Sequence, residues 1–217
     1  MTVGDWSERT WSVAFFGHFN PWITTTGWME RFAVITPEER ARALENVDPS
    51  GAAINLGSLS FEVSLERFLV QTSVEAERGR LPEVTAGVFG VLGHTPVESL
   101  AIGFDGEWSM PNGTGAVDLV SLLLSDPLPA VLSSAIARSV TLRLDGISGP
   151  GATTHLTVED SDEGMGGVYL SLVDEVELDS GIDVESADMA VRELERRWPQ
   201  FTTECEHVVE ELVQALG

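Results

Sequence analysis

The sequence predicts an α+β fold in which helices pack on one face of an antiparallel sheet. Apolar residues alternate with polar ones along several short runs, which indicates strands with one buried face. The connections between the last three runs are short and rich in turn residues, as in a meander of antiparallel strands. From Ser186 onward the apolar spacing is helical. We therefore expect one compact α+β domain over residues 1–217 with a helical C-terminus.

Local signals define the elements expected in the N-terminal half. Asn20-Pro21 ends the first strand. Thr36 is a good helix cap with proline and two glutamates after it, so a helix should run from there to about Asn46. Gly57 falls where an alternating run skips a residue, which predicts a bulge. The expected elements are strand 11–19, helix 37–46, a hairpin of strands 54–63 and 68–72, helix 82–92 and strand 100–110.

The C-terminal half contains the same mixture of elements. Its expected elements are helices 116–124 and 128–137, strands 139–144, 153–159 and 168–178, a helix over 186–198 and a final helix from 203. Pro199 should interrupt the helical C-terminus. The loop at residues 111–115 is the best candidate for a boundary between two sub-domains. Pseudo-duplicated halves are a hypothesis here, because no residue-level repeat accompanies the similar element content.

Charge is the strongest signal in the composition. The chain has 35 acidic and 12 basic residues, all 12 of them arginine, and a net charge of −23. Residues 111–217 hold 20 acids and 5 arginines, against 15 and 7 in residues 1–110. We interpret the lysine-free, acidic composition first as a matter of genome and solubility, and second as a surface for a basic partner. It argues against direct binding of nucleic acid, because attraction to phosphate needs a basic face.

The sequence contains no targeting, membrane or cofactor signal. No apolar run is long enough to span a bilayer, and no basic-then-apolar leader begins the chain. Cys205 has no second cysteine to pair with, so we expect a cytoplasmic protein in which this thiol is a small buried hydrophobe. The four histidines lack metal-ligand spacing, and no nucleophile or phosphate-binding motif occurs. We expect no metal and no cofactor, and these observations favour a protein that is not an enzyme.

Two groups of residues are candidates for contact with a partner. Four of the six tryptophans fall within the first 28 residues, and tryptophan is enriched in interface hot spots, although core packing is the default interpretation. The densest run of acids spans a strand end and a helix start, where solvation and the helix dipole also account for them. The candidate contact residues are Trp11, Trp22, Trp28, Asp174, Glu175, Glu177 and Asp179.

Short motifs resemble those of a sporadically distributed bacterial protein family. The segments that carry the resemblance are 16–21, 67–72, 87–92, 94–97, 143–146 and 167–170. They are structural and apolar, so the resemblance implies an expected fold and provides no functional residues. The sporadic distribution of such a family implies an accessory role, for example in defence or in neutralising a toxin.

Three functional hypotheses follow from these observations. The first is a non-enzymatic protein-interaction or accessory module of the defence or immunity type, whose partner is another protein, with a homo-oligomer as a variant. The second is a small-ligand-binding protein or enzyme with a pocket between the sheet and the C-terminal helices, where His94, Arg143 and Asp145 are the polar candidates. The third is an acidic nucleic-acid mimic that uses residues 159–188.

Overall fold

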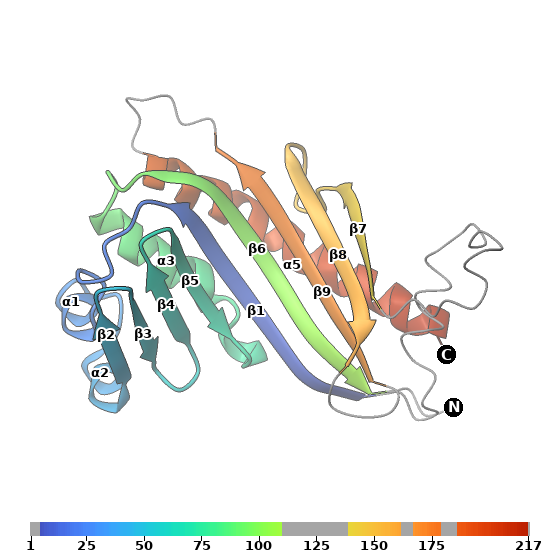
Figure 1. Cartoon of the computed structure of the whole chain (residues 1–217), viewed down its shortest axis with the longest axis horizontal. Helices are drawn as coiled ribbons and strands as arrows, with labels where there is room; N and C mark the ends of the chain where they lie inside the picture. The colour runs from blue at the N-terminus through green and yellow to red at the C-terminus, as the bar shows by residue number, and fades with distance from the viewer. Residues whose placement is uncertain (1–4, 110–138, 162–166, 179–185, 217) are drawn as a thin grey trace.

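The chain folds around one antiparallel sheet that includes strands from both halves of the sequence. The computed structural model describes residues 5–109, 139–161, 167–178 and 186–216. Its strands are β1 (Asp5–Gly17), β2 (Leu44–Asp48), β3 (Gly51–Asn55), β4 (Ser60–Ser64), β5 (Arg67–Thr72), β6 (Val97–Ser109), β7 (Ser139–Asp145), β8 (Ala152–Asp160) and β9 (Gly167–Glu177). They hydrogen-bond in the order β2-β3-β4-β5-β1-β6-β9-β8-β7, and every pairing is antiparallel (Figure 1).

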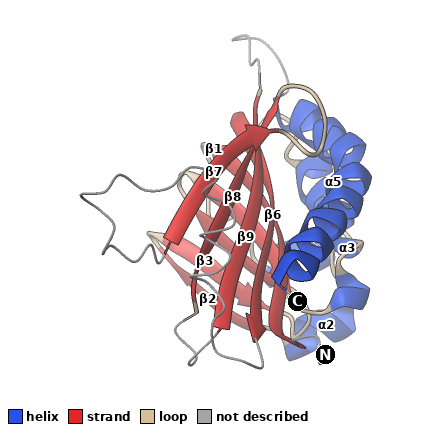
Figure 2. Cartoon of the chain, turned by 90° about the vertical axis from the view of Figure 1, so that its right-hand side faces the viewer, coloured by secondary structure: helices blue, strands red, loops and turns tan. Residues whose placement is uncertain are grey.

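Helices lie along one face of this sheet (Figure 2). The long C-terminal helix α5 (Ser186–Leu216) packs on β6, and α3 (Arg80–Val91) packs on β1, β5 and α5. Shorter helical segments are α1 (Thr26–Arg31), α2 (Pro37–Arg42) and the 3-10 turn η1 (Glu75–Glu77). The predicted α+β class, with helices on one face of an antiparallel sheet, is confirmed. Within the described residues, no helix is both long enough and apolar enough to cross a bilayer.

The hydrophobic core lies between the sheet and the two long helices. Trp11, Val13 and Phe15 alternate along β1 and are buried, whereas Phe16 on the other face is exposed. From α5, Phe201 and Cys205 complete the layer. Alternation along β1 places its large apolar side chains on the helix-covered face, and each large side chain buried there contributes roughly 2 kcal/mol.

The strand order has the symmetry of two similar halves. β1 and β6 form the central pair, and their register runs from Asp5↔Ser109 to Gly17↔Val97. Outward from this pair, β5, β4 and β3 on one side correspond to β9, β8 and β7 on the other. In each half, a helix follows the strand that pairs with the central strand, α3 after β5 and α5 after β9. This topology agrees with pseudo-duplicated halves, while the sheet continues across both. The boundary expected at 111–115 lies outside the described residues.

Two elements predicted in the N-terminal half, the helix over 37–46 and the bulged strand over 54–63, are wrong in their bounds. The helix expected over 37–46 ends at Arg42, and β2 starts at Leu44 because its backbone pairs with β3. The single bulged strand expected over 54–63 is two strands, β3 and β4. Gly57 lies in the turn between them at φ 91°, a left-handed conformation that glycine adopts readily. The helices expected over 116–124 and 128–137 lie outside the described residues.

The interruption predicted at Pro199 is also wrong, because α5 continues through it to Leu216. Proline removes one helical hydrogen bond. The hydroxyls of Thr202 and Thr203 donate to the Pro199 carbonyl oxygen at 3.1 and 3.0 Å. Burial of Phe201 and Cys205 against the sheet holds the following turns in helical form.

Candidate docking site

A cavity opens at the end of the sheet where β1 ends. Its volume is about 240 Å³. It lies between the loop of residues 18–24, strands β4 and β5, the last turn of α3 and the loop before β6. The residues around it are His18, Phe19, Asn20, Ile23, Thr24, Val63, Phe68, Val88, Phe89, Leu92, Thr95 and Pro96. Most of this wall is apolar, and its three phenylalanine rings contact one another: Phe89 lies 5.0 Å from Phe68 and 6.0 Å from Phe19 between ring centroids.

Backbone contacts fix the loop that forms one side of the cavity. The His18 amide donates to the Pro96 carbonyl at 3.0 Å, and the Phe19 amide donates to the Leu65 carbonyl at 2.9 Å. Gly17 is required for this close approach, since a Cβ at that position would lie 2.1 Å from the Pro96 carbonyl oxygen. The strand expected over 11–19, with its end at Asn20-Pro21, instead begins at Asp5 and ends at Gly17, where the backbone turns toward Pro96.

A tight turn then leads from the loop into α1. The Asn20 side chain accepts a hydrogen bond from the Trp22 amide, and the Asn20 carbonyl accepts one from the Ile23 amide. Thr25 caps α1 by accepting a bond from the Trp28 amide. This turn holds the Trp22 and Ile23 side chains at the surface beside the cavity.

Thr24 is a buried polar residue in the cavity wall. The residue is 3% exposed and lines the cavity, but its hydroxyl is not among the polar atoms of the described residues that are both buried and unpaired. The hydroxyls of both neighbouring threonines form hydrogen bonds: Thr25 caps α1, and the Thr26 hydroxyl donates to Glu45 at 2.6 Å. A guest that covered the Thr24 hydroxyl without pairing with it would cost about 1–3 kcal/mol, so a guest group that hydrogen-bonds to it would avoid that cost.

Large apolar side chains are exposed beside the cavity mouth. We call Trp22, Ile23 and Leu65 the apolar rim; their exposed fractions are 58%, 37% and 58%. Ile23 also lines the cavity, and the Leu65 carbonyl accepts a hydrogen bond from the amide of the lining residue Phe19. Exposed apolar residues that gather around a concavity are typical of interaction sites, whereas scattered ones need no explanation.

The three tryptophans that the sequence proposes as contact residues differ in their burial. Trp11 is buried at 2% exposure, so its proposed role in contact is wrong. Its ring lies 4.8 Å from that of Phe104, and its indole N–H donates to Glu75 at 3.1 Å. Trp28 is half-buried against Phe32, with centroids 5.0 Å apart. Trp22 is the exposed member of the three.

The acidic run 174–179 does not form one surface. Asp174 is fully buried on the helix-covered face, where it accepts hydrogen bonds from the Ser148 amide at 2.7 Å and from the Thr154 hydroxyl. Glu175 and Glu177 are exposed, because alternate residues of β9 point to opposite faces. Asp179 lies outside the described residues. A nucleic-acid mimic built on this region would have to use its exposed members alone.

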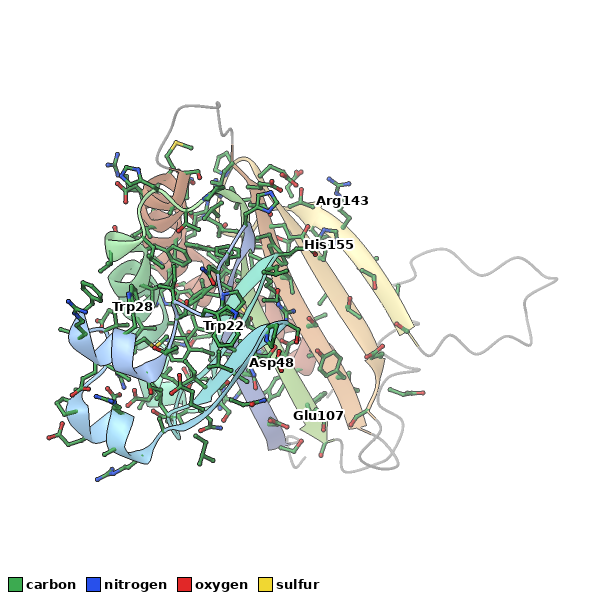
Figure 3. The ribbon with its side chains drawn as sticks, turned by 60° about the vertical axis from the view of Figure 1, so that its left-hand side comes forward. Trp22, Trp28, Asp48, Glu107, Arg143 and His155 are labelled. Atoms are coloured by element: carbon green, nitrogen blue, oxygen red, sulfur yellow. The ribbon has the colours of Figure 1, made fainter. Side chains whose placement is uncertain are left out.

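The polar residues proposed for a sheet–helix pocket are not brought together. Arg143 and Asp145 lie on the edge strand β7, and two strands separate β7 from β6, which follows the loop that contains His94. Arg143 is opposite His155 across the β7–β8 pair, and Figure 3 shows both of them well apart from Trp22 and Trp28. His155 Nε2 lies 3.6 Å from Glu175 Oε2. Arg143 and His155 point to the sheet face opposite the core, where Thr153 and Thr157 are their neighbours.

The described residues offer little catalytic chemistry. No three His, Cys, Asp or Glu side chains among them are placed to hold a metal ion. The Cys205 thiol is buried as expected, and burial raises its pKa, which keeps it in the unreactive protonated form. The cavity and its apolar rim are therefore the site with the clearest binding chemistry. Sequence reasoning missed this cavity, because its lining comes from five separate segments.

A scan against protein-family models and a search of curated proteins each found no match. The functional argument therefore depends on the residues of this chain.

Proposed function

We propose that the protein is a non-enzymatic interaction module that docks another protein at the apolar rim. In this proposal, the partner inserts one apolar side chain into the cavity. The observation that carries it is a cavity of about 240 Å³ beside three exposed apolar side chains. An anchor side chain that fills a pocket, surrounded by contacts that exclude water, is the usual arrangement of an interface hot spot.

The size of the cavity favours a side chain over a cofactor or a large substrate. Sites for drug-sized ligands and cofactors usually have volumes of about 300–1,000 Å³ and several converging polar groups. This cavity is smaller, and Thr24 is the deeply buried polar residue in its wall. On a chain with a net charge of −23, a lining that contains no acidic residue and is mostly apolar is suited to an apolar anchor.

Site-specific cross-linking tests this proposal. Benzoylphenylalanine would replace Trp22 or Leu65 in the apolar rim, and Leu144 on the distant edge strand β7 as a matched exposed control. In the native host, we expect one and the same protein to cross-link from positions 22 and 65 and not from 144. Excess unlabelled protein should compete for this cross-link.

Substituted forms of the unlabelled competitor protein test whether the cavity itself is needed for docking. An Ile23→Asp competitor should fail, because it adds a charge at the cavity mouth, whereas Leu144→Asp should compete as well as the unsubstituted protein. Equal cross-linking from all three positions, or none from 22 and 65, would refute docking at the apolar rim.

A further inference from the structure

Three acidic residues lie close to segments that line the cavity. Glu98 lies beside a lining residue, with its Oε1 3.7 Å from His18 Nε2. Glu66 follows Leu65 in the turn that is bonded to the loop of residues 17–19. Asp188, in the first turn of α5, lies against Gly93, where a Cβ would come within 3.0 Å of its Oδ1. The nearby Arg67 is already paired with Glu62 at 2.9 Å. The surroundings of the cavity therefore carry three carboxylates, of which Glu98 lies within ion-pair distance of His18, and this negative charge favours a basic partner.

The cavity wall has the shape and chemistry for an aromatic ring. Phe19, Phe68 and Phe89 contribute to it from three segments, and they already meet in tilted or edge-to-face contacts. A cavity of about 150 Å³ is sufficient to hold benzene, and this one measures about 240 Å³. Ring pairs in such geometries contribute about 0.5–1.5 kcal/mol beyond simple burial. An aromatic guest therefore fits better than an aliphatic one.

Thr24 adds a specific polar requirement. Thr24 lines the same wall, so an entirely apolar guest that covered its hydroxyl would leave that hydroxyl without a hydrogen-bond partner. A guest with an aromatic body and a hydroxyl at the tip would satisfy it. Among protein side chains, tyrosine has this structure.

We infer that the partner binds through a tyrosine flanked by basic residues, which rests on the proposed docking function. The tyrosine ring lies among the three phenylalanines, its hydroxyl pairs with Thr24, and the flanking basic groups face Glu66, Glu98 and Asp188. Charge complementarity of this kind increases specificity for a basic partner and raises the association rate. Salt screens the charges and weakens both effects.

Peptide titrations of the isotope-labelled full chain, followed by NMR, test this inference. The probes are pentapeptides with blocked ends: tyrosine between glycines with arginine at both ends, the same peptide with phenylalanine, and the tyrosine peptide with glutamates at both ends. We expect the arginine–tyrosine peptide to shift the amide signals of Ile23 and Thr24. The phenylalanine peptide should bind about five-fold more weakly and the glutamate peptide at least about ten-fold more weakly.

Two sets of variants distinguish the contribution of the Thr24 hydroxyl to peptide binding from that of the acidic side chains. In Thr24→Val the difference between the tyrosine and phenylalanine peptides should disappear, whereas the fold and the arginine preference remain. The pair Glu66→Gln and Glu98→Gln should weaken the arginine–tyrosine peptide about five-fold and flatten its salt dependence. The matched pair Glu204→Gln and Glu210→Gln, on the exposed side of α5, removes the same charge and should change affinity less than two-fold.

Several results would overturn the inference. Equal affinity for tyrosine and phenylalanine would remove the role of Thr24, and equal affinity for arginine and glutamate ends would remove the basic partner. Binding of p-cresol as tight as that of the peptide would indicate a small-molecule site, and shifts that depend on protein concentration alone would indicate a second copy. Cross-links from positions 22 and 65 to a partner segment without tyrosine would refute this inference and leave the proposed docking function standing.

Discussion

Ser148 lies between two buried charges that come from different elements. Its amide donates to Asp174 on β9, and its hydroxyl accepts a hydrogen bond from Arg197 on α5 at 3.3 Å. Arg197 also donates to the carbonyls of Gly149 and Pro150 at 3.2 and 2.8 Å. Buried charges are tolerated when they are paired and fully hydrogen-bonded. This network holds the β7–β8 turn against the C-terminal helix.

Arg197→Met should destabilise the protein by about 3 kcal/mol, because it leaves buried carbonyl groups without donors. The neighbouring Arg196 is the matched control: both arginines contact Glu193, at 2.6 and 2.8 Å, but Arg196 is exposed. Arg196→Met should change stability by no more than about 0.5 kcal/mol. Urea unfolding measures both. Equal losses would mean that the buried network contributes no more than a surface ion pair.

Tyr169 is the only tyrosine in the chain, so its ionisation can be followed alone. Burial, followed by a hydrogen bond to Asp105, raises the pKa of its phenol well above the ordinary value. In an ultraviolet titration, the phenolate band should be absent at pH 10.5 in the folded protein and appear with unfolding, given an ordinary pKa of about 10. Asp105→Asn should lower that pKa. A normal titration in the native state would contradict the buried geometry.

At the scale of elements, α2 is short and depends on its cap. Thr36 and Glu39 form a reciprocal capping box, and Glu39 also pairs with Arg80 on α3 at 2.7 Å. Burial raises the pKa of Glu39, but the hydrogen bonds from Thr36 and the contact with Arg80 outweigh it and leave the pKa below its usual value. The capping box connects α2 to α3 through charge, so it should respond to pH.

Because the folded pKa of Glu39 is lowered, its contribution is present above the unfolded pKa and is lost as pH falls through the folded value. Stability should therefore decrease between about pH 5 and pH 3, and this decrease should be smaller in Glu39→Gln. Thr36→Ala should cost about 1 kcal/mol at pH 7. Denaturant unfolding at a series of pH values measures both effects. An identical pH profile in Glu39→Gln would refute the linkage.

Elements with strong local signals were predicted well. Strands β7, β8 and β9 and the cap at Thr36 match their expected positions, because alternation and capping depend on residues close in sequence. α1, β2 and the continuity of α5 through Pro199 were not predicted. In each, contacts with distant residues decide the outcome: Glu45 holds the start of α1, β3 pairs with β2, and the sheet supports α5.

At the scale of the whole molecule, repulsion among its many acidic side chains destabilises the folded state. With a net charge of −23, exposed carboxylates repel one another over distances comparable to the Debye length. Raising sodium chloride from about 0.05 M to about 0.5 M shortens that length about three-fold and should raise the melting temperature by a few degrees. Thermal unfolding at constant pH checks this prediction. A melting temperature that falls with salt would mean that favourable ion pairs, such as that of Arg78 with Glu206, outweigh the repulsion.

The sequence by itself determined the α+β class, the one-sided core and the acidity, because each follows from periodicity or composition. Only the tertiary structure decided which of the candidate residues share a site. It buried Trp11 and Asp174, left Trp22 exposed, and separated Arg143 from the loop of His94. The physical reason is that the cavity beside Thr24 arises where the ends of β1, β5, α3 and the loop before β6 converge, and no local pattern encodes that convergence.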